Sequence, residues 1–145
     1  MMDTSGHKPW IRVAIFVGVV YFVVGAGFAA LANPSGSDQV RFTWRLAAWV
    51  ISAAVYAAHI GYEHFRLNNS AWATALHAAI AVALGGLLLA VAATVHKMMV
   101  PSHNPYWRFL VALAVWPIVT GLPAFLVALA AAAVLAGLSR KRSAK

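Results

Sequence analysis

The chain has 145 residues, of which 63% are hydrophobic and only 10% are charged. A soluble domain of this size needs more charged side chains on its surface, so the composition indicates a membrane protein. The net charge of +8 does not indicate a nucleic-acid partner, because the basic residues lie in short groups between apolar runs. The sequence contains no cysteine, which excludes disulfides and thiolate metal sites.

Four segments are long and apolar enough to cross a bilayer as helices, which takes about 20 residues each. In chain order they are residues 10–32, 44–65, 71–96 and 107–138. The connections between them are short, so neighbouring helices should run antiparallel. The sequence therefore predicts one all-α integral membrane domain over residues 1–145. We expect an antiparallel up-down bundle of four transmembrane helices, followed by a short basic tail at 139–145.

The basic residues predict the orientation of this bundle, because four crossings place both termini on one side. That side carries Lys8, Arg12, Arg66, Arg140, Lys141, Arg142 and Lys145, whereas the other side carries Arg41, Arg45, Lys97 and Arg108. By the positive-inside rule this excess predicts cytoplasmic termini. Many small bacterial membrane proteins share the four-span layout, so we expect the bacterial inner membrane, with its anionic headgroups in contact with the basic tail. Aromatic belts are expected at Trp10 and Trp72 inside and at Trp44, Trp49 and Trp107 outside.

Polar residues of the second segment lie on one helical face. Ser52, Tyr56, His59, Glu63 and Arg66 follow one another at spacings of 4, 3, 4 and 3 residues. His59 and Glu63 are therefore i,i+4 neighbours that can interact along the helix.

The third segment brings a further histidine to the same depth. His59 lies seven residues before Arg66, and His77 lies seven residues after Ser70. At about 1.5 Å per residue, the two histidines are level with each other. We therefore predict a buried polar cluster in the inner leaflet, made of Tyr56, His59, Glu63, Thr74 and His77.

This cluster is compatible with three functions, two of which need no cofactor. In the favoured interpretation the chain is a non-enzymatic module that forms a homo-oligomer or binds a membrane-protein partner, and the cluster fixes the helix register. The alternative is a proton-linked transporter or channel subunit that uses His59 and Glu63, since ionisable groups inside membranes often carry protons. Beyond Tyr56 the stripe offers only Ser52, so a complete proton path is not visible in the sequence.

A second alternative is electron transfer through haem b. His59 and His77 could ligate the iron from two helices, and Arg66 could pair with the propionates. Helices in contact lie about 8–10 Å apart, which is tight for a ring plane and two imidazoles. We therefore expect no cofactor, with haem b as the lesser alternative.

A metal site is the weakest of the candidates. His96, Met98, Met99 and His103 lie within eight residues, and this combination suits copper(I). The simpler expectation is that His96 and Lys97 stabilise the negative end of the third helix. No catalytic arrangement and no family motif stand out in the chain.

Overall fold

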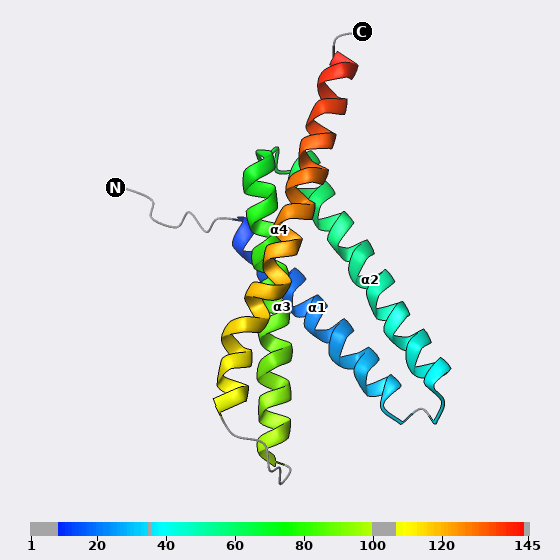
Figure 1. Ribbon diagram of the computed structural model, residues 1–145. Helices are drawn as coiled ribbons and strands as arrows, with labels where there is room; N and C mark the ends of the chain where they lie inside the picture. The colour runs from blue at the N-terminus through cyan, green and yellow to red at the C-terminus, as the bar shows by residue number, and fades with distance from the viewer. Residues whose placement is uncertain (1–8, 35, 100–106, 144–145) are drawn as a thin grey trace.

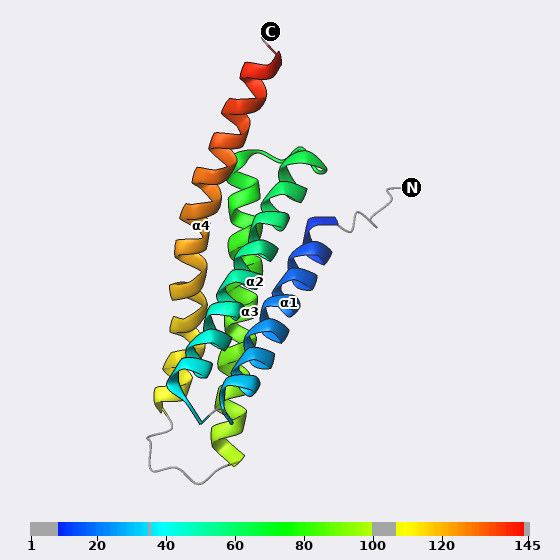
Figure 2. The same ribbon diagram turned by 90° about the vertical axis from the view of Figure 1, so that its right-hand side faces the viewer.

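The computed structural model describes residues 9–34, 36–99 and 107–143, and these residues form four α-helices. They are α1 (Pro9–Ala32), α2 (Asp38–Phe65), α3 (Ala71–Met99) and α4 (Trp107–Ser143). Consecutive helices run in opposite directions, so α2 and α4 end at the same end of the molecule (Figures 1 and 2). The prediction of an all-helical chain is confirmed.

Three of the four helices are long and apolar enough to cross a membrane. They are Trp10–Ala32, Ala71–Met99 and Trp107–Ser139, judged by length and composition alone. α2 is not among them although it has 28 residues, which differs from the four apolar spans that the sequence predicts. The difference arises because α2 contains two arginines, an aspartate, a glutamate and two histidines among its apolar residues.

α1 begins one residue earlier than predicted, and three other helix boundaries differ by more than that. α2 begins at Asp38 and not at residue 44, because the Ser37 hydroxyl caps it by accepting a hydrogen bond from the Val40 amide at 3.3 Å. α3 continues from the expected residue 96 to Met99. α4 continues to Ser143, so most of the predicted tail at 139–145 is helical, since no glycine or proline follows Leu138 to stop it.

The turn between α2 and α3 reverses the chain within a few residues. Asn68 adopts a left-handed conformation with φ of 50°, which asparagine tolerates better than most residues. The Ser70 hydroxyl then accepts a hydrogen bond from the Ala73 amide at 3.3 Å and caps α3. This tight reversal lays the last turns of α2 beside the first turns of α3.

Small residues allow α3 to lie close to its neighbours. A Cβ atom added to Gly85 would lie 2.6 Å from the Tyr21 Cβ of α1, and one added to Gly86 would lie 2.7 Å from the Thr120 Oγ1 of α4. Glycine is therefore required at these two helix crossings. α2 is less enclosed, and its buried residues are His59, Ile60 and Glu63, all near its C-terminal end.

The distribution of burial is the reverse of that in a water-soluble protein. Large apolar side chains lie on the outside, including Trp49 at 75% exposure and Phe16 at 69%. Among the described residues, the largest side chains that are fully buried are Glu63 and Thr74. A fully buried carboxylate is the informative feature, because Glu is almost never buried unless it is paired.

Candidate functional site

Glu63 is the centre of the buried polar cluster. Its side chain is completely buried in the last turn of α2, and its Oε2 lies 2.8 Å from the His77 Nδ1 of α3. The Asn69 side-chain amide, from the turn between the two helices, donates a second hydrogen bond to the same oxygen. An unpaired carboxylate would be costly here, so these two contacts are what allow Glu63 to be buried.

His77 connects the cluster to α1. The indole of Trp10 stacks flat on the imidazole, with ring centroids 4.2 Å apart and an angle of 1° between the planes. The indole covers one face of the His77 ring, while Nδ1 at the edge of that ring contacts Glu63. The cluster thus joins the first turn of α1, the end of α2, the start of α3 and the intervening turn.

His59 lies on the other side of the carboxylate. It is buried, and its Nε2 is 3.6 Å from Glu63 Oε1, too far for a good hydrogen bond. Within the described residues, both ring nitrogens of His59, Glu63 Oε1 and the buried Thr74 hydroxyl make no hydrogen bond. The His59 side of the cluster therefore has polar atoms without hydrogen-bond partners, whereas the side formed by His77 and Asn69 is hydrogen-bonded.

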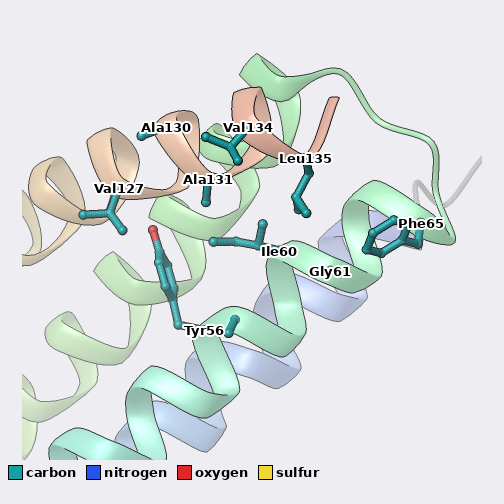
Figure 3. Close-up of a pocket in the computed structure, with 10 residues that line it drawn as sticks. Tyr56, Ile60, Gly61, Phe65, Val127, Ala130, Ala131, Val134 and Leu135 are labelled. Atoms are coloured by element: carbon teal, nitrogen blue, oxygen red, sulfur yellow. The ribbon is translucent and has the colours of Figure 1, made fainter. Parts of the chain in front are cut away.

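Tyr56 lies outside the cluster into which the sequence placed it. Its hydroxyl donates a hydrogen bond to the Ala124 carbonyl of α4. Figure 3 shows the side chain pointing from α2 towards α4. The helical stripe was correct in spacing, but α4 passes close to α2 at this level and supplies the nearer acceptor. Tyr56 therefore joins α2 to α4, whereas Glu63 joins α2 to α3.

Arg66 and the two candidate haem ligands do not form a ready cofactor site. Arg66 is exposed at the C-cap of α2, and no ion pair links it to Glu63 in the part of the chain that the structure describes. The side chains of His59 and His77 both face the Glu63 carboxylate. A haem iron ligated by both imidazoles would require that carboxylate to move away.

The candidate copper residues lie at the opposite end of α3. Met98 and Met99 are exposed in its last turn, where His96 is also found. His103 falls outside the described residues. Over residues 9–34, 36–99 and 107–143, no group of three histidine or carboxylate side chains is placed to hold a metal ion.

Asn69 and Trp10 belong to the cluster but were missed by the sequence reasoning. The signal for Asn69 was its position in a tight turn soon after a buried acid, where a side-chain donor can fold back onto the helix end. Trp10 looked like an ordinary interfacial aromatic residue. Its partner lies on α3, 67 positions later in the chain, and no local pattern reports such a contact.

Comparisons with protein families, curated proteins and solved structures find no match to this chain. Its function must therefore be inferred from the geometry of the cluster and of the surface. That geometry offers two chemical capacities. The cluster can lock three helices in register, and its His59 side can hold or pass a proton.

Proposed function

We propose that the chain is an integral membrane protein with four transmembrane helices that forms an oligomer or binds a membrane-protein partner through α2, without catalytic activity. Both termini lie in the cytoplasm. The apolar exterior of α1, α3 and α4 supports insertion into a bilayer. The seven basic residues on the side of the termini, against four on the other, support the orientation.

The observation that carries this proposal is the outer half of α2. This half exposes Phe42 at 65% and Trp49 at 75%, on the same helix as Arg45. Large aromatic side chains are typical anchors of interfaces, and these stand exposed on the one described helix that is not apolar enough to be counted as a membrane span. Contact with a second polypeptide would cover the aromatic side chains and give Arg45 a polar partner.

The buried cluster has a supporting role in this function. Glu63, His77 and Asn69 fix the rotation of α2 at its inner end, and Trp10 adds α1 to the same cluster. Because a helix is stiff, fixing one end also sets the direction in which its outer half faces. The cluster would therefore determine which residues of α2 a partner meets.

Site-specific photo-crosslinking in intact membranes tests the proposal. A benzoylphenylalanine at Trp49 should form crosslinks to protein, either to another copy of this chain or to a different membrane protein. The matched control is the same probe at Leu126 of α4, which is also well exposed and should react mainly with lipid. Equal reaction with lipid at both positions would contradict the proposal.

Proton-linked transport is the second candidate, and the unsatisfied half of the cluster favours it. His59 and Glu63 Oε1 face each other at 3.6 Å without a hydrogen bond, so a proton could be exchanged between them. In liposomes loaded with a pH-sensitive dye, a transporter would move protons and Glu63→Gln would abolish that flux. A wild-type protein without flux would leave the interaction module as the function.

A further inference from the structure

A shallow, open apolar groove of about 650 Å³ runs along the surface between the inner halves of α2 and α4 (Figure 3). Its deeper side includes Ile60, which is 4% exposed, while Phe65 and Val134 on its two walls are 63% and 62% exposed. Gly61 widens the groove, because a Cβ atom added there would meet nothing within 4 Å. The groove is separate from the Glu63 cluster, which lies between α2 and α3.

We propose that this groove binds an acyl chain of an anionic phospholipid, whose headgroup is held at the cytoplasmic end by Arg66. The inference rests on the membrane orientation proposed above. It adds a ligand that neither the cluster nor the outer half of α2 requires.

The shape and polarity of the groove select a hydrocarbon chain. The hydroxyl of Tyr56 is the one side-chain polar group among its lining residues, and it is already hydrogen-bonded to Ala124. That bond and the packing of Leu135 near Ile60 hold the two helices together along the groove. A third helix, about 10 Å across with its side chains, would rest on the rims and leave the deeper side empty. A flexible chain of methylene groups can fill it.

The charge at one end of the groove selects an anionic headgroup. α2 and α4 run in the same direction (Figure 1), so both walls end at the same side of the molecule. Arg66 directly follows Phe65, and the sequence Arg140-Lys141-Arg142 begins five residues after Leu135, roughly 7–8 Å further along the helix.

Within the described residues, no free carboxylate side chain lies at this end of the two helices to offset the basic charge. The sequence has no Asp or Glu after Glu63, and Glu63 itself is buried and bonded to His77 and Asn69. Basic pockets between transmembrane helices on the cytoplasmic side are typical sites for anionic lipid headgroups. An apolar tail in the groove with an anionic group at this end describes a phospholipid.

Lipid retention by the full-length protein tests the inference. The protein is purified in mild detergent from membranes containing phosphatidylglycerol and phosphatidylethanolamine, and bound lipid is measured by native mass spectrometry. We expect the wild type to retain phosphatidylglycerol preferentially. Gly61→Leu and Ala57→Leu should each lose most of it, because the new side chains occupy the groove.

Two further variants separate filling of the groove from other effects. Arg66→Gln should reduce the preference for phosphatidylglycerol by about fivefold, as expected for one basic contact at a membrane surface. Gly27→Leu on α1 is the matched control, because Gly27 also faces open space and lies away from the groove. It should retain lipid as the wild type does.

Two results would overturn the inference: unchanged lipid in both groove variants, or equal retention of the two lipids by the wild type. If unchanged lipid came with a loss of protein crosslinks in the groove variants, the groove would be a protein interface. Failure of the proposed function would look different. The wild type would then give no protein crosslinks at Trp49 but would still retain lipid.

Discussion

At the scale of single residues, the contacts of one carboxylate account for most of the cluster. Glu63 Oε2 has two partners, His77 and Asn69, whereas Oε1 has only the distant His59. Both partners of Oε2 come from beyond the end of α2, so the carboxylate ties that end to the turn and to α3. Removing it leaves the polar groups of His77 and Asn69 without their acceptor.

We expect Glu63→Ala to lower the free energy of unfolding by about 2–3 kcal/mol, because it leaves buried donors unsatisfied. Glu63→Gln should cost on the order of 1 kcal/mol, since the amide oxygen can still accept one hydrogen bond. Thermal and denaturant unfolding in detergent micelles would measure both changes.

The matched control is Asp38→Asn at the start of α2. Asp38 pairs with Arg41 at 2.6 Å, but its side chain is 97% exposed, and such pairs contribute little. Its unfolding should therefore be nearly that of the wild type. If Glu63→Ala were as stable as Asp38→Asn, the cluster would not hold the helices together.

At the scale of helices, α3 is the element around which the others are arranged. Gly85 lies against Tyr21 and the Gly18 carbonyl of α1, and Gly86 lies against Thr120 of α4. These close approaches give α3 neighbours on two sides, while its first turns also meet α2 through His77. α2 has its buried residues near its C-terminal end only, which leaves its N-terminal half as the most exposed part of the helix.

We expect Gly85→Ala to destabilise the protein by about 1–3 kcal/mol. The added methyl group would lie 2.6 Å from the Tyr21 Cβ, which cannot rotate away because it is bonded directly to the backbone. Gly27→Ala is the control, since it faces open space and should gain up to about 1 kcal/mol in helix propensity. Opposite shifts of the two unfolding midpoints are the expected result, and a stabilised Gly85→Ala would show that α1 and α3 are not in close contact.

At the scale of the whole molecule, the path of α2 relative to the membrane decides the topology. Its polar residues lower the mean hydropathy of the helix, but His59 and Glu63 are buried in the cluster. Contacts with the neighbouring helices therefore offset the cost of burying these two polar groups, as a crossing of the bilayer by α2 would require.

Because the chain contains no cysteine, single cysteines can report its topology directly. With four crossings, Ser5→Cys and Ser143→Cys should both be protected from an impermeant maleimide added to intact cells, while Gly36→Cys should be labelled. If α2 lay flat on the membrane, three crossings would put the two ends of the chain on opposite sides. Labelling of one terminal cysteine and protection of the other would then be observed.

Part of the candidate site could be read from local spacing. The 4-3-4-3 pattern of α2 and the counts to either side of the turn brought His59, Glu63 and His77 to one level, and all three side chains are buried in the structure. Local spacing could not show that Tyr56 reaches α4 or that Trp10 stacks on His77. Those contacts depend on how each helix is rotated about its axis.

The sequence by itself determined the helical class, the apolar character of three helices and the face of α2 on which its polar groups lie, because these properties depend on neighbours within a few turns. Only the tertiary structure decided which side chains of different helices are in contact. It also showed that Asn69 donates a hydrogen bond to the Glu63 carboxylate and that a groove lies between α2 and α4. The reason is that helix rotation and crossing are set where small residues such as Gly85 and Gly86 allow close approach, and these crossings join segments far apart in the chain.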